Sequence, residues 1–119
     1  MALLTLKFAT DVRDEDYEVV EFHGELDQST VSNAEKQVNE LLENYKRKYL
    51  IFDLTNLKYI NSEGIGFVVS THVHLVKKTQ SLIVCGMRPN VEEVFAAMGL
   101  PKLFQVFKTI SEAISSIKK

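Results

Sequence analysis

Several stretches of apolar residues along the chain have the spacing and composition of β-strands. In residues 3–10 and 17–26, apolar side chains alternate with polar ones, and the charged segment 11–16 between them is typical of a hairpin turn. Residues 49–54 and 81–85 are mostly apolar, as strands covered on both faces of a sheet are. The sequence therefore predicts an N-terminal antiparallel hairpin followed by two buried strands.

Four other segments place apolar side chains three or four positions apart, which is the spacing of an amphipathic helix. They are residues 31–45, 65–78, 89–98 and 110–117. Ser32 with Glu35, and Thr109 with Glu112, have the spacing of a capping box at the start of the first and last of these helices. Gly99 is expected to end the third helix.

The order of these elements predicts an α/β fold. Residues 103–107 are expected as an edge strand, and residues 55–62 as a loop whose Leu57, Tyr59 and Ile60 pack against the fold. The resulting order is β-β-α-β-α-β-α-β-α, and strand–helix–strand repeats pair in parallel through right-handed crossovers. We expect a mixed, mainly parallel five-stranded sheet with an N-terminal β-hairpin and four helices.

Composition narrows the class of protein. The net charge is −2 and the basic residues are scattered, so the chain lacks the basic footprint of a nucleic-acid-binding protein. The lone cysteine, Cys85, closes an apolar run and is expected as a buried thiol in a reducing compartment. No apolar run approaches the ~20 residues needed to cross a bilayer, and no signal-peptide pattern is present. We expect a cytoplasmic protein without membrane insertion, with residues 1–119 forming one domain.

Five polar residues follow predicted strands. Asp27 follows the second strand, Asp53 is near the end of the third, and Asn61, Ser62 and Glu63 open the next helix. The carboxyl ends of parallel strands meet at one edge of a sheet, so we expect these residues to share that edge. The free N–H groups at the helix N-terminus also suit an anion, whether bound, attached or built in.

Two glycines, Gly64 and Gly66, are predicted in the first turn of the same helix. Glycine is a poor helix former, so two of them indicate that another part of the chain approaches the backbone closely. Tight packing of the helix on the sheet and a surface for a partner protein are both open as reasons.

The chain lacks the usual signatures of catalysis. It shows no nucleophile with an adjacent base, no metal-ligand spacing and no glycine-rich phosphate loop. His72 and His74 are two positions apart on a helix and point different ways, and His72 is expected as a satisfied core histidine. We therefore expect no enzymatic activity, no metal and no cofactor.

Motifs spread over essentially the whole chain resemble the STAS domain, and more narrowly the bacterial anti-sigma factor antagonists. The family pattern has a G-x-L-D segment, a strand ending in D-L, and an I-D-S-S-G-L-G helix start, and their order and spacing together are specific. The matching segments are Gly24-Glu25-Leu26-Asp27, Phe52-Asp53-Leu54, Tyr59-Ile60-Asn61-Ser62-Glu63-Gly64-Ile65-Gly66, Met98-Gly99-Leu100 and Leu103-Phe104.

The resemblance implies a non-enzymatic partner switch. In that family the unmodified domain binds an anti-sigma factor that is also a serine kinase, and this frees the sigma factor. The kinase then phosphorylates the second serine of the D-S-S-G motif, which breaks the complex, and a phosphatase restores it. The implied partner-binding residues here are Asp27, Asn61, Ser62, Glu63, Gly64 and Ile65, with Asp53 as a supporting residue at the same edge.

This chain departs from the family pattern at the phosphoacceptor position, which is Glu63, and at the preceding acid, which is Asn61. Three interpretations stay open: Glu63 is a fixed partial mimic of the phosphorylated form, the partner accepts a glutamate, or Ser62 has become the acceptor. A purely structural interpretation is that Ser62 caps the helix, worth ~1 kcal/mol, and that Glu63 meets the helix dipole, worth roughly 0.3–1 kcal/mol.

The missing acceptor also leaves other roles open. One is a phosphorylation-independent STAS module that serves as an accessory subunit of a transport or lipid-trafficking complex, or as a signalling scaffold. Another is a small-molecule sensor. The sequence leaves a homodimer open as well.

Overall fold

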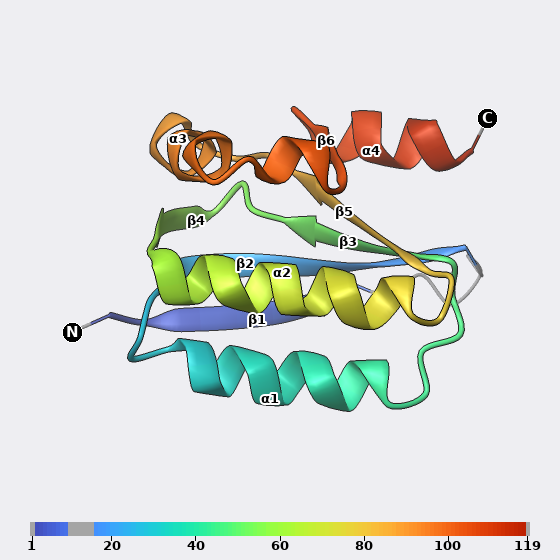
Figure 1. Cartoon of the computed structure of the whole chain (residues 1–119), viewed down its shortest axis with the longest axis horizontal. Coiled ribbons are helices and arrows are strands. Elements are labelled where there is room, and N and C mark those ends of the chain that lie inside the picture. Colours follow the sequence, from blue (N-terminus) through green and yellow to red (C-terminus); the bar gives the residue numbers. More distant parts are fainter. Residues whose placement is uncertain (1, 10–15, 119) are drawn as a thin grey trace.

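The computed structural model describes residues 2–9 and 16–118, and the strands within them form one mixed sheet (Figure 1). The hairpin is antiparallel and the later strands pair in parallel, in the order β1-β2-β3-β5-β6. This confirms the predicted α/β fold, while most of the predicted turn between the first two strands lies outside the described residues. The five strands in this order are β1 (Leu4–Ala9), β2 (Tyr17–Leu26), β3 (Tyr49–Asp53), β5 (Ser81–Cys85) and β6 (Gln105–Phe107).

A sixth strand in the described residues, β4 (Leu57–Ile60), replaces part of the loop that the sequence predicted. It pairs in parallel with the end of β2, so that Gly24 is opposite Leu57 and Leu26 is opposite Ile60. The strand has four residues and is buried at its two ends only, so it has neither the alternation nor the length that identifies a strand. The expectation that Tyr59 packs against the fold is wrong, because this residue is 45% exposed.

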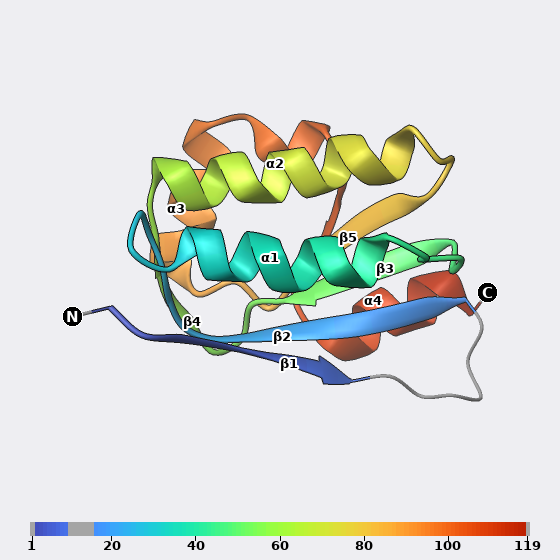
Figure 2. The same ribbon diagram turned by 90° about the horizontal axis from the view of Figure 1, so that it is seen from below.

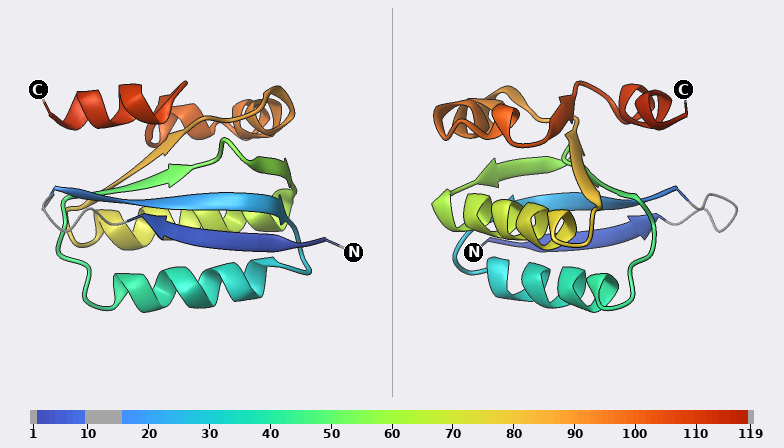
Figure 3. Two further views of the ribbon diagram at one scale, coloured as in Figure 1. Left: turned by 180° about the vertical axis from the view of Figure 1, so that it is seen from behind. Right: turned by 45° about the vertical axis from the view of Figure 1, so that its right-hand side comes forward.

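Four helices are present in the described residues, and they are α1 (Val31–Leu42), α2 (Ser62–Val76), α3 (Pro89–Ala97) and α4 (Ile110–Ile117). The first two run side by side along one face of the sheet (Figure 2). The strands lie between α1 and α4 (Figure 3). A short 3-10 turn, Leu100–Lys102, follows α3, and β6 consequently starts two residues later than predicted.

The core has two parts because successive residues of a strand point to opposite faces of the sheet. Phe22 and Phe52 of the sheet pack against Phe67 of α2, with ring centroids 4.8 Å apart for Phe22–Phe52 and 5.9 Å apart for Phe52–Phe67. Ile51 and Cys85 face α4 on the other side. Cys85 is fully buried, as predicted; burial, and then the charge of Asp53, raise the pKa of its thiol to about 12.

The helix starts agree only in part with the predicted capping boxes. α1 begins after Thr30, so Ser32 and Glu35 lie within the helix and that box is wrong. The Thr30 hydroxyl instead donates to the carbonyl of Glu25 at 2.9 Å, which ties the start of α1 to β2. In α4, Thr109 accepts the N–H of Glu112 at 3.1 Å as predicted, while the Glu112 carboxylate accepts the N–H of Lys108 at 3.3 Å.

Candidate functional site

Asn61 caps α2 and fixes the turn between β4 and that helix. Its backbone is extended, with φ −115° and ψ −173°, and its Oδ1 accepts hydrogen bonds from the N–H groups of Glu63 and Gly64, both at 3.1 Å. A cap of this kind satisfies N–H groups that the helix itself leaves free. The interpretation of Ser62 as the cap is therefore wrong, because Asn61 is one residue earlier and already holds these two groups.

Asn61 also joins α2 to the loop before α1. Its Nδ2 donates to Gln28 Oε1 at 2.7 Å, and its backbone N–H donates to the carbonyl of Leu26 at 3.2 Å. The two bonds hold this loop beside the start of α2, and the two helices begin at the same end of the sheet (Figure 2). Sequence reasoning missed Gln28, because its bond to Asn61 depends on the pairing of β2 with β4.

Asp27 lies in the same loop and is engaged mainly by its own neighbours. Its Oδ1 accepts the Ser29 N–H at 2.8 Å and the Ser29 hydroxyl at 2.7 Å. The hydroxyl first, and then the N–H groups of Ser29 and Thr30, hold the pKa of the Asp27 carboxyl below its usual value. Asp27 therefore brings a negative charge to the loop that Asn61 holds beside α2.

The two glycines of the first turn have different surroundings. A Cβ at Gly64 would lie 2.7 Å from Ile60 Cγ1 and 2.9 Å from both Cγ and the carbonyl oxygen of Leu26, so a side chain there would force its neighbours to move. Around Gly66 nothing lies within 4 Å of such a Cβ, and the residue is exposed. Close packing on the sheet accounts for Gly64, whereas Gly66 leaves a bare stretch of helix surface.

Ser62 and Glu63 are the members of the predicted set that project from the first turn of α2. Both are exposed, whereas Gly64 is buried and Ile65 is only 2% exposed. We call Asn61, Ser62 and Glu63 the docking turn, after the partner-binding role that the sequence resemblance implies for them. Gly64 and Ile65 support it from beneath, because Ile65 belongs to the core between the helices and the sheet.

The expectation that Asp53 shares an edge with the docking turn is wrong. Asp53 is opposite Glu21 on β2, whereas Ile60 is opposite Leu26. Five residues along a strand correspond to about 16 Å. The strand β4 separates the two places, and the Asp53 carboxylate accepts the Thr55 hydroxyl at 2.6 Å instead.

A metal centre, a membrane span and a ligand pocket are other features that a functional site could involve. Within residues 2–9 and 16–118, no cluster of three or more His, Cys, Asp and Glu side chains could hold a metal ion. In the same residues, no helix has the length and apolar character to cross a membrane. Hollows of about 310 to 560 Å³ occur on the described surface, and the docking turn lines none of the four that are best formed.

One of these hollows, of about 310 Å³, is lined partly by His72. The ring lies 5.4 Å from that of Phe104, and Nδ1 is buried without a hydrogen-bond partner in the described part of the chain. The expectation that the ring of His72 has its hydrogen bonds satisfied is therefore wrong for Nδ1.

The STAS domain family model matches residues 8–113, and the chain belongs to this family. The match includes both helices that begin at the docking turn and its neighbouring loop. It also includes the Asn61–Glu63 segment itself.

The most similar relatives include anti-sigma factor antagonists. The chain is 29% identical to the anti-sigma-B factor antagonist of Staphylococcus aureus over 87% of this chain and 94% of that protein. It is 23% identical to the anti-sigma F factor antagonist of Paenibacillus polymyxa over 84% and 86% of the two chains. The crystal structure of an anti-sigma factor antagonist from Mycobacterium paratuberculosis has the same fold, with a TM-score of 0.86 at 21% identity over 98% and 96% of the chains.

Proposed function

We propose that this chain is a non-enzymatic, cytoplasmic partner-switching regulator of the anti-sigma factor antagonist type. Its partner would be an anti-sigma factor with serine kinase activity, which docks on Asn61, Ser62, Glu63 and the neighbouring loop with Asp27. The observation that carries the proposal is the exposed Ser62–Glu63 pair in the first turn of α2. The relatives' names and the position of the family's phosphoacceptor motif support the same assignment.

Glu63 gives the docking turn one permanent negative charge, where a phosphoserine would carry about −1.5 to −2 at neutral pH. No described hydrogen bond or ion pair engages its carboxylate, so the charge faces whatever docks. We infer that Glu63 is a fixed partial mimic of the phosphorylated form. At an exposed contact one charge changes binding by about 1 kcal/mol, or about fivefold in Kd.

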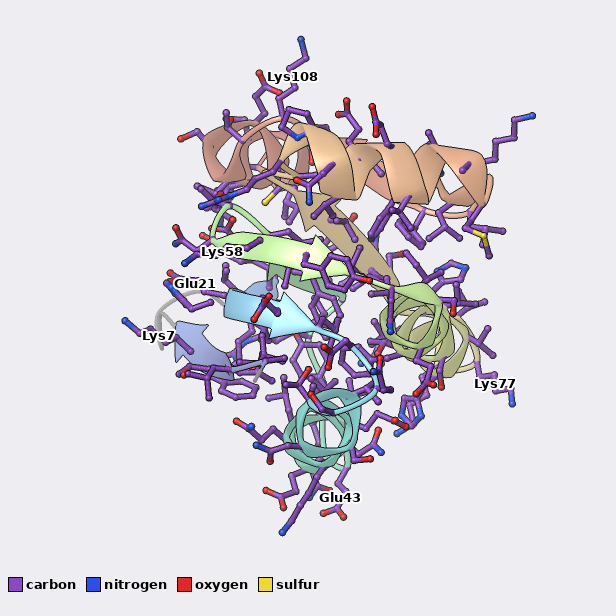
Figure 4. The ribbon with its side chains drawn as sticks, turned by 90° about the vertical axis from the view of Figure 1, so that its left-hand side faces the viewer. Lys7, Glu21, Glu43, Lys58, Lys77 and Lys108 are labelled. Atoms are coloured by element: carbon purple, nitrogen blue, oxygen red, sulfur yellow. The ribbon has the colours of Figure 1, made fainter. Side chains whose placement is uncertain are left out.

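A binding experiment tests the partner and the charge separately. Wild type, Glu63→Gln and Glu63→Ser would be titrated into each kinase-type anti-sigma factor of the source cell by calorimetry. Glutamine keeps the size of the side chain and removes its charge, so both variants should bind about fivefold more tightly than wild type. Glu43→Gln removes the same charge at the far end of α1 and should leave the Kd unchanged (Figure 4).

Kinase and ATP then test the switch. Glu63→Ser should gain a phosphate at position 63 and lose affinity, while wild type should keep both its mass and its Kd. A phosphate on Ser62 of the wild type would refute the fixed-mimic assignment and make Ser62 the acceptor. Failure of wild type and both variants to bind any candidate partner would refute the proposed function as a whole.

A further inference from the structure

The face of the sheet that α4 covers is apolar at one end and polar at the other. Val19 and Ile51 lie under α4, whereas Glu21 and His23 continue β2 beyond the covered part. Figure 4 shows Lys58, Glu21 and Lys7 on one side of the molecule, on β4, β2 and β1 in turn. This end of the face therefore carries charged side chains and no covering helix.

A hollow of about 330 Å³ lies in this polar region and is lined by His23, Gly24, Asn56, Lys58 and Arg88. The three basic residues come from β2, β4 and the segment that leads into α3. The pairing of β2 with β4 shifts register after Gly24, which has φ +128°. Position 24 has no room for a side chain, because a Cβ there would lie 2.1 Å from the carbonyl oxygen of Leu3 on the neighbouring chain segment.

Long-range hydrogen bonds fix the backbone around the hollow. Arg88 Nε donates to the carbonyl of Thr55 at 3.2 Å, and Asn90 Nδ2 donates to the carbonyl of Lys58 at 2.9 Å. The Gly24 N–H donates to the carbonyl of Asn56 at 3.1 Å. The backbone that carries the basic side chains is therefore already ordered in the absence of a ligand. This lowers the entropy cost of ordering the protein when a ligand binds.

The charges around the hollow favour an anion. None of the five lining residues is acidic, and Glu21 and Asp53, two of the acids on the strands β2 and β3, are already engaged. Glu21 Oε1 lies 3.0 Å from His23 Nε2, and Asp53 Oδ1 accepts the Thr55 hydroxyl. Lys58 and Arg88 form no ion pair with a carboxylate within the described ranges, although the whole chain has a net charge of −2.

We propose that this hollow binds the phosphate group of a small phosphate ester. The remaining guanidinium N–H groups of Arg88 and the ammonium of Lys58 are the donors that phosphate oxygens prefer. His23 lines the same hollow, with its Nε2 already engaged by Glu21. The volume is at the lower end of the range for ligand pockets, about 300–1,000 Å³, and leaves room for a short organic substituent. This site does not include the docking turn, so a test of phosphate binding does not depend on whether the proposed function is correct.

Nuclear magnetic resonance titration of the ¹⁵N-labelled full chain tests the site, with inorganic phosphate and glycerol phosphate as probes at constant ionic strength. Both should give saturable shifts at the amides of Gly24, Asn56, Lys58 and Arg88, with millimolar dissociation constants. Glycerol phosphate should bind at least as tightly as inorganic phosphate. If only inorganic phosphate binds, the assignment to a phosphate ester is wrong.

Lys58→Gln is the variant of choice, because no described hydrogen bond or ion pair engages its side chain. It should weaken both probes about fivefold, the effect of one exposed charge contact. Lys77→Gln makes the same charge change at the end of α2, on the opposite side of the molecule in Figure 4, and should leave both dissociation constants unchanged. Equal weakening by the two variants, shifts centred elsewhere, or no saturation would overturn the proposal.

Discussion

Replacing Gly64 with alanine tests how closely α2 is packed against the sheet. The added Cβ would approach Ile60 Cγ1 at 2.7 Å and Leu26 at 2.9 Å, and these two residues are 3% and 0% exposed. One of the close atoms is the carbonyl oxygen of Leu26, which accepts the N–H of Asn61 at 3.2 Å. Relief of the clash by moving that backbone would therefore disturb the docking turn itself.

Two opposing effects set the size of the change. Overpacking a tight core site costs about 1–3 kcal/mol, whereas alanine gains up to about 1 kcal/mol over glycine in a helix. We expect Gly64→Ala to lower the free energy of unfolding by about 1–2 kcal/mol. Gly66→Ala is the matched control: it has open space around the new methyl group and should raise that free energy by about 0.5–1 kcal/mol.

Urea unfolding followed by far-ultraviolet circular dichroism measures both variants under one set of conditions. The midpoints should move in opposite directions with unchanged slopes, because the area exposed on unfolding is nearly the same. If Gly64→Ala is as stable as Gly66→Ala, or more stable than wild type, the close approach of α2 to β2 and β4 is not as the structure has it.

Three further changes probe the cap, a buried acid and the buried thiol. Asn61→Ala should lower the free energy of unfolding by about 1–2 kcal/mol in urea titrations, whereas Asn61→Asp should restore most of it. Desolvation raises the pKa of the Glu18 carboxyl above its usual value, and the positive charge of Arg47 opposes this shift only in part. The folded protein therefore favours the protonated acid, and this contribution to the free energy of unfolding is lost as the pH rises above about 4.5. Glu18→Gln should be less sensitive over that range, and equal pH profiles of unfolding free energy would contradict this reasoning. The Cys85 thiol, with a pKa of about 12, should react with a disulfide reagent at pH 8 only after unfolding, and fast reaction of the native protein would contradict its burial.

The spacing of apolar residues predicted the helices and strands correctly where an element is long enough to show the repeat of a helix or a strand. Residues 17–26 and 81–85 became strands with the predicted bounds, because tertiary packing and local pattern agree there. The strand at Leu57–Ile60 escaped prediction because β4 is set by its pairing with β2, including a register shift after Gly24. The residues Leu57–Ile60 themselves show no strand pattern, because the two central residues of this four-residue segment are both exposed.

The same missed strand explains what the sequence could and could not predict of the site. The polar residues at the start of α2 were placed correctly at a helix N-terminus, because a strand, a polar turn and a helical pattern follow one another there. Asp53 was expected nearby because the carboxyl ends of parallel strands meet at one edge of a sheet. The strand β4 lies between Asp53 and the start of α2, so the Asp53 carboxylate is about one strand length from Asn61. The residue beside Asn61 is instead Gln28, which no pattern in the sequence indicated.

If the proposed match to the family pattern holds, the docking turn has its negative charge at a different position and carries no additional charge. The D-S-S-G pattern has its acid at the position of Asn61, where the side chain is turned inward to cap the helix. In this chain the amide oxygen of Asn61 performs the capping without a charge, and the carboxylate stands instead at Glu63, on the exposed side of the first turn. Position 61 is the N-cap and position 63 lies in the first turn of α2, so a negative charge at either position interacts favourably with the helix dipole. Under the proposed function, a partner that docks on this turn meets the charge of Glu63 directly. We therefore expect substitutions at position 63 to change binding more than substitutions at position 61.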